Sequence, residues 1–124
     1  MKFRTMKEIE EGKKPYSASV RNGVIKKASL ETISSGYRIS FKIETGKGDV
    51  GVSFTTTDKA FGKELAGWLK LFNLSGGVPE AFERTPLRIM EFPDSDLYFG
   101  DALEDRFESV SGIHRQAREE ADGD

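Results

Sequence analysis

The sequence contains no cysteine and a single histidine, His114. Without cysteine there is no disulfide framework and no thiol nucleophile, and one histidine cannot supply the three or four ligands of a typical zinc site. No Gly-x-Ser-x-Gly elbow precedes His114, so we expect a surface histidine without a catalytic role. We therefore predict a protein that is not an enzyme, with no catalytic residue, no metal and no cofactor.

Long apolar segments are also missing. No run approaches the roughly 18 apolar residues of a membrane span, and the first residues, Met1 to Glu8, hold no signal-peptide core. The 124 residues suit one domain that folds without a disulfide or a metal. We expect a cytoplasmic protein without membrane contact, with one domain over residues 1–117 and a frayed acidic tail over 118–124.

The first half of the chain has the pattern of a short helix followed by strands. Thr5 to Glu8 matches a capping box, which predicts a helix over residues 5–11. Apolar residues then recur at every second position in four segments, 16–21, 24–33, 37–44 and 50–56. Asn22-Gly23, between the first two segments, is a strong signal for a hairpin turn. The pattern predicts a four-stranded antiparallel meander with one apolar and one polar face.

The second half begins with an apolar stripe of helical period. It predicts a helix from Thr57 or Asp58 to about Asn73, packed on the apolar face of the meander. A strand over 87–92 is expected at a sheet edge because prolines flank it. A short strand at 97–99 and a final helix through 103–110, with Gly112 as an interruption, complete the prediction.

These elements predict an α+β domain. Its parts are a four-stranded antiparallel meander, one main helix on the apolar face, a short N-terminal helix and a C-terminal strand and helix. The alternative is a small barrel of the oligonucleotide-binding type, because three strands, a helix and further strands can close in that way.

Charge is unevenly distributed along the chain. Residues 1–47 contain eleven Lys and Arg against five Glu, whereas residues 48–124 contain eight against sixteen Asp and Glu. On the polar face of the meander we expect a basic strip that consists of Lys27, Arg38 and Lys42, bordered at the turns by Arg21 and Lys47. Such a strip is typical of proteins that track a single-stranded phosphate backbone. The first hypothesis is therefore a non-catalytic, nucleic-acid-binding module.

Proteins that bind single strands also use aromatic side chains for base stacking, and the sequence supports these less clearly than the basic strip. Tyr37, Phe41 and Phe54 fall on the apolar face, where we expect them in the core. Three other aromatic residues are left as stacking platforms: Tyr16, Tyr98 and Phe99.

The C-terminal third contains a group of six carboxylates, namely Asp94, Asp96, Asp101, Glu104, Asp105 and Glu108. A calcium loop from Asp94 fails, because Tyr98 occupies a ligand position and Phe99 replaces the required glycine. The second hypothesis is a protein-binding accessory or inhibitor that engages a basic protein surface through these residues, as a nucleic-acid mimic would. A metal-dependent hydrolase is the least favoured hypothesis. The sequence leaves the oligomeric state open.

Overall fold

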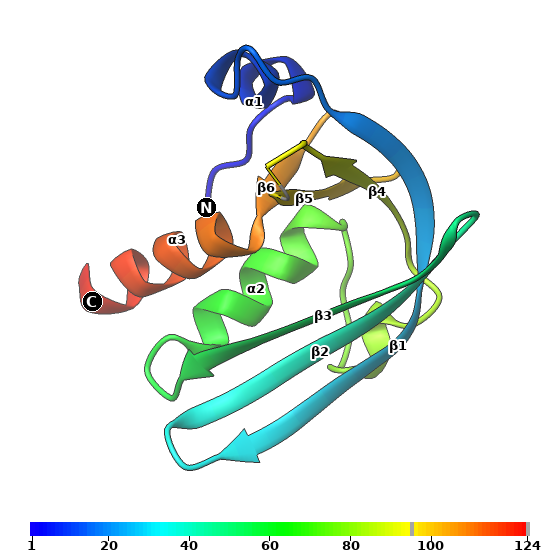
Figure 1. Cartoon of the computed structure of the whole chain (residues 1–124). Helices are drawn as coiled ribbons and strands as arrows, with labels where there is room; N and C mark the ends of the chain where they lie inside the picture. Colours follow the sequence, from blue (N-terminus) through cyan, green and yellow to red (C-terminus); the bar gives the residue numbers. More distant parts are fainter. Residues whose placement is uncertain (95, 124) are drawn as a thin grey trace.

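The computed structural model describes residues 1–94 and 96–123. Within these residues it contains an antiparallel sheet in the strand order β3-β2-β1-β4-β5-β6, which curls into a half-barrel around α2 (Figure 1). The elements in chain order are α1 (Met6–Gly12), β1 (Ser19–Ile33), β2 (Gly36–Thr45), β3 (Gly48–Thr57), α2 (Phe61–Leu71), the 3-10 helix η1 (Glu80–Phe82), β4 (Pro86–Glu91), β5 (Leu97–Asp101), β6 (Phe107–Ser109) and α3 (Val110–Gly123).

The long strand β1 joins the two halves of the sheet. Residues 19–24 pair with β4, and residues 23–33 pair with β2. The predicted hairpin turn at Asn22-Gly23 is therefore wrong, and the first two strands of the predicted meander are one strand. An added Cβ at Gly23 would lie 2.8 Å from Cγ2 of Ile43 and 3.2 Å from the carbonyl oxygen of Glu44. Gly23 thus permits the close approach of β2 instead of forming a turn.

Helix α2 packs on the concave face of β1–β3, as the apolar stripe predicted. The Trp68 ring is central, 5.7 Å from the Phe41 ring and 5.3 Å from the Phe54 ring between centroids. Leu65, Leu71 and other buried residues complete this core. The α+β class and the antiparallel sheet are confirmed, and the core holds α2 against the strands whose opposite face is polar.

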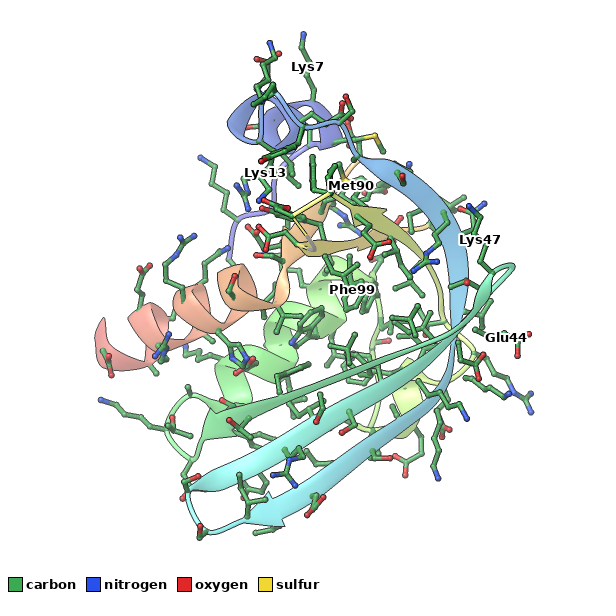
Figure 2. The ribbon with its side chains drawn as sticks, viewed as in Figure 1. Lys7, Lys13, Glu44, Lys47, Met90 and Phe99 are labelled. Atoms are coloured by element: carbon green, nitrogen blue, oxygen red, sulfur yellow. The ribbon has the colours of Figure 1, made fainter. Side chains whose placement is uncertain are left out.

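A second apolar cluster lies on the other face of β4–β6, under α1, and consists of Ile9, Met90, Phe92, Tyr98 and Phe107. The predicted capping box starts α1: the N–H of Glu8 donates to Oγ1 of Thr5 at 3.2 Å, and the N–H of Thr5 donates to Oε1 of Glu8 at 2.9 Å. Figure 2 labels Met90 on the α1 side of the sheet and Phe99 on the α2 side. These strands therefore separate two cores.

Several expectations for the C-terminal part are wrong. The final helix, expected through 103–110, begins only at Val110, and Phe107–Ser109 form the strand β6. Strand β4 lies between β1 and β5 and not at an edge. Residues 118–123, expected to fray, are the last turns of α3, where Ala121 is buried. Gly112 lies inside this helix without interrupting it. Asp124 lies outside the described residues.

Candidate nucleic-acid interface

The convex face of β1–β3 exposes polar side chains in cross-strand rows. Side chains alternate between the two faces of a strand, so these residues point away from α2. The rows are Glu31–Arg38–Thr55, Ser29–Ser40–Ser53 and Lys27–Lys42–Gly51. Small serine side chains thus lie between the cations on this curved face.

An irregularity in β1 adds another lysine to this face. The register between β1 and β2 shifts after Ile25, so the consecutive residues Lys26 and Lys27 are both exposed. Lys27 lies directly opposite Lys42, and like charges in this position destabilise a sheet. Lys47, in the adjacent β2–β3 turn, projects at the same end of the sheet (Figure 2). We refer to Lys26, Lys27, Lys42 and Lys47 as the lysine cluster.

Two carboxylates partly neutralise the lysine cluster. Asp49 Oδ2 lies 3.7 Å from Nζ of Lys42 and 3.9 Å from Nζ of Lys26, and Glu44 Oε2 lies 3.6 Å from Nζ of Lys26. Ion pairs this exposed contribute only about 0–1 kcal/mol. Among the described residues, Lys27 and Lys47 have no ion pair within 4.0 Å. Four cations against two anions leave the cluster positive.

The two arginines of the predicted strip differ in position. Arg38 lies on the convex face, where Nη1 is 3.4 Å from Oε1 of Glu31. Arg21 lies on the other side of β1, the side on which Gly23 and Ile25 are buried, and its guanidinium is 3.8 Å from Glu91. The structure therefore gathers Lys27, Arg38, Lys42 and Lys47 on or beside one face and separates Arg21 from them.

Aromatic residues are absent from the convex face of β1–β3, all of whose residues are described. Tyr37, Phe41 and Phe54 point to the core side as predicted, and the Tyr37 ring stacks on Phe61 at 3.9 Å. Tyr98 and Phe99 are buried, which removes both as stacking platforms, whereas Tyr16 is 48% exposed. Any contact with nucleic acid on this face must depend on charge and hydroxyl groups.

The carboxylates Asp94 and Asp96 face Lys13. The Lys13 ammonium donates to Oδ2 of Asp94 at 2.7 Å and to Oδ2 of Asp96. The hydrogen bond to Asp94 is the main cause of the raised pKa of Lys13, and the same bond lowers the pKa of Asp94. These two acids are therefore already paired with a cation of the same chain.

The remaining predicted acids are divided between buried and exposed positions. Glu108 is 1% exposed, and its Oε1 accepts from Nη2 of Arg4 at 2.5 Å. Asp101 is 9% exposed and accepts from the backbone N–H groups of Leu103 and Glu104. Burial acts to raise the pKa of Asp101, but these N–H groups and the Arg106 guanidinium outweigh it and lower the pKa.

The two exposed acids also have partners within the chain. Oδ1 of Asp105 accepts from the backbone N–H of Met6 at 2.8 Å, and Glu104 Oε2 lies 3.5 Å from Nε of Arg106. Each of the six carboxylates thus has a partner within the chain, and two pairs share one: Asp94 and Asp96 share Lys13, and Asp101 and Glu104 share Arg106.

The expectation for His114 is wrong in one respect, because the side chain is only 22% exposed. Nδ1 of His114 lies 2.5 Å from Oε1 of Glu64, which is 1% exposed. The imidazole also meets the Phe54 ring edge-on, with centroids 5.1 Å apart. The sequence held one indication of this pair: Glu64 lies one turn before Trp68, on the apolar side of α2.

Other classes of site find little support in the described residues. Within residues 1–94 and 96–123, no group of three or more His, Cys, Asp or Glu is arranged to hold a metal ion. No helix in this part of the chain is long and apolar enough to cross a membrane. No protein-family model, curated protein or solved structure matches the chain.

Proposed function

We propose that this protein is a non-catalytic module that binds single-stranded nucleic acid on the convex face of β1–β3. The observation that carries the proposal is the direct opposition of Lys27 and Lys42 at the irregularity in β1. Two like charges held opposite each other weaken the free protein. A phosphate group between them would replace this repulsion with two attractions, so the same feature favours the bound state.

The topology supports this face over others. Strand β1 pairs with both β2 and β4, α2 follows β3, and the sheet curls around α2. This arrangement is similar to the partly open, five-stranded Greek-key barrel of oligonucleotide-binding folds, which bind on the face of their second and third strands. The convex face of β2 and β3 carries Lys42, Arg38 and the hydroxyl groups of Ser40 and Ser53.

The chemistry of this face indicates how it binds. Without exposed aromatic side chains, the phosphate backbone supplies most of the affinity. Binding is therefore expected to tolerate many sequences and to weaken strongly with salt. A protein partner for the acidic third is less supported, because Asp94, Asp96, Asp101 and Glu108 are engaged within the chain.

The test compares two double variants that change the net charge equally. Lys27→Gln with Lys42→Gln removes the opposed pair, whereas Lys7→Gln with Lys70→Gln removes exposed lysines of α1 and α2. Fluorescence anisotropy with labelled oligo(dT) at low salt measures the affinity. We expect the first variant to bind several-fold more weakly and the control to bind like the wild type. Equal loss in both variants would indicate a general charge effect and would remove the proposed face.

A further inference from the structure

Strand β3 forms one edge of the sheet, and it pairs with β2 on one side only (Figure 1). The opposite edge, β6, is short and is closed by the segment before α1. There the N–H of Arg4 donates to the carbonyl of Phe107 at 3.1 Å, and the N–H of Phe107 donates to the carbonyl of Arg4 at 2.8 Å. Within residues 1–94 and 96–123, no backbone hydrogen bond of this kind reaches β3 from any element other than β2. The β6 edge is therefore paired, and the β3 edge is open.

The backbone groups that point out of this edge follow from the turn that precedes β3. Thr45 and Gly48 flank a two-residue turn, and residues in these positions form a hydrogen-bonded pair. Such pairs recur at every second position along an antiparallel ladder. The N–H and C=O groups of the residues between them point away from β2, and these residues are Asp49, Gly51, Ser53, Thr55 and Thr57. Strand β3 thus offers alternating donors and acceptors to a further strand.

Helix α3 lies near the second half of β3 without closing the edge. The His114 ring meets the Phe54 ring on the core side of the strand, with centroids 5.1 Å apart. Beside residues 55–57, a cleft of about 500 Å³ separates β3 from the α3 residues His114 and Arg118. The helix therefore does not take the place of a neighbouring strand.

Strand β3, all of whose residues are described, also lacks the features that keep edge strands from pairing. Natural edges are protected by lysine, proline, bulges or a short length. Strand β3 has ten residues, contains neither lysine nor proline, and has Asp49 as its one charged residue. Its register with β2 is regular from end to end, whereas β1 is irregular after Ile25. An open, regular edge of this length with a single charge indicates a strand partner.

The sequence of β3 is complementary to a second copy of itself. The outward-pointing residues are centred on Ser53, so an antiparallel pair with Ser53 opposite Ser53 engages all of them. Asp49 of each copy then lies opposite Thr57 of the other, and Gly51 lies opposite Thr55. No charge meets a like charge in this register, which would destabilise the pair.

The core side of β3 fits the same register. Val52 lies opposite Phe54 of the second copy, and an aromatic residue beside a β-branched one is a favourable cross-strand pair. Val50 and Val52 are only partly buried, so the second strand covers apolar surface that the single chain leaves exposed. We propose that two copies of this chain pair antiparallel through β3, about a two-fold axis at Ser53. This proposal does not depend on nucleic-acid binding.

The first experiment measures the association of the full chain without nucleic acid. The contact is smaller than a standard protein interface, so we expect the dimer to form in the micromolar range. Analytical ultracentrifugation from low micromolar to submillimolar concentration should show a reversible equilibrium between monomer and dimer. The assembly should stop at the dimer, because an isologous pair uses the open edge of both copies. A chain that stays monomeric over this range, or that forms larger assemblies, would overturn the inference.

Ser53 permits a test that distinguishes this edge from other contacts. Its side chain is exposed on the convex face, where its Oγ lies 3.1 Å from Oγ of Ser40. Ser53→Asp and Ser53→Lys each place two like charges opposite each other at the axis. Each should raise the dissociation constant of the dimer at least about tenfold. An equal mixture of the two variants brings opposite charges together and should dimerise like the wild type.

Recovery in the mixture also shows that both variants are folded. If neither variant dimerises and their mixture does not recover, the pairing about Ser53 is wrong. Ser29→Asp and Ser29→Lys are the matched controls, because Ser29 belongs to the same cross-strand row but lies on β1, inside the sheet. Both should dimerise like the wild type. An equal loss in the Ser29 variants would indicate a general charge effect and would remove β3 as the interface.

Amide hydrogen exchange locates the contact along the strand. In dilute solution the outward amides of Gly51, Ser53 and Thr55 should exchange rapidly, whereas those of Val52 and Phe54, which point to β2, should be protected. At concentrations that favour the dimer, the outward amides should become protected as well. Dimerisation without this gain in protection would place the interface elsewhere and overturn the inference. Since neither measurement uses nucleic acid, failure of oligo(dT) binding would leave the dimer standing, and the reverse also holds.

Discussion

Lys27 and Lys42 are direct cross-strand partners on the exposed face of the sheet. Replacing Lys27 with Glu converts a repulsive pair into an attractive one. Because a favourable cross-strand pair contributes roughly 0.2–1 kcal/mol, we expect Lys27→Glu to raise the free energy of unfolding by a few tenths of a kcal/mol. The same substitution should weaken binding of oligo(dT). Urea denaturation and anisotropy measure the two effects.

A Lys27→Glu protein that is more stable but binds oligo(dT) more weakly would distinguish a binding role of Lys27 from a structural one. Stability gained together with function lost is typical of a binding residue that is not optimal for the fold. Lys7→Glu, which changes the net charge equally but lies on α1, serves as the control (Figure 2). A Lys27→Glu protein that is less stable and binds normally would show that the opposed lysines belong to the fold and not to binding.

Gly112 leaves space for a buried carboxylate. A Cβ at this position would lie 2.4 Å from Oε1 of Glu108, which Arg4 and the N–H of Ser109 hold in place. We expect Gly112→Ala to destabilise the protein by about 1–3 kcal/mol, although alanine favours helices. Gly62→Ala in α2 is the matched control, because its Cβ would meet no atom within 4 Å. That variant should gain up to about 1 kcal/mol. If urea denaturation shows that Gly112→Ala and Gly62→Ala change the free energy of unfolding in the same direction, the packing argument is contradicted.

Asp101 should contribute to acid sensitivity. Its pKa is lower in the folded protein than in the unfolded chain, so the folded state favours the ionised form. The stabilisation is present above the unfolded pKa of about 3.9 and is lost as the pH falls through the folded pKa. The stability difference between the wild type and Asp101→Asn should be constant above about pH 5 and narrow below it. A difference that does not change with pH would contradict this role.

The end of α3 should be required for stability. Ala121 is buried, and the amino group of Met1 lies 3.2 Å from Oε1 of Glu120. Deleting residues 119–124 keeps Arg118 but removes both contacts, and burying one small side chain is worth on the order of 1 kcal/mol. We expect a lower thermal midpoint for the truncated chain. An unchanged midpoint would mean that this segment behaves as the frayed tail that the sequence suggested.

Local sequence patterns were sufficient to predict those elements whose signal lies within a few neighbouring residues. The capping box at Thr5, the alternation in β2 and β3, and the apolar stripe of α2 each depend on neighbours within a few residues. The same alternation predicts which residues lie on the polar face of these strands. Lys27, Arg38 and Lys42 therefore lie on one face, as expected.

Long-range contacts decided the features that the sequence could not show. Asn22-Gly23 fits a turn or a crowded strand equally well, and Ile43, twenty positions away, decides between them. Glu108 resembles a surface acid until Arg4, 104 positions away, is placed beside it. The Glu64–His114 pair likewise forms only when α2 and α3 pack together.

The salt dependence of oligo(dT) binding tests the central claim most directly. Single strands give a slope of about −0.7 in log affinity against log salt for each phosphate contact. Four contacts from the lysine cluster predict roughly a 50-fold loss of affinity between about 50 and 200 mM salt. Lys27→Gln with Lys42→Gln should reduce this loss to about sevenfold, since two contacts remain. No binding at low salt, or a slope that the two substitutions leave unchanged, would contradict binding at this face.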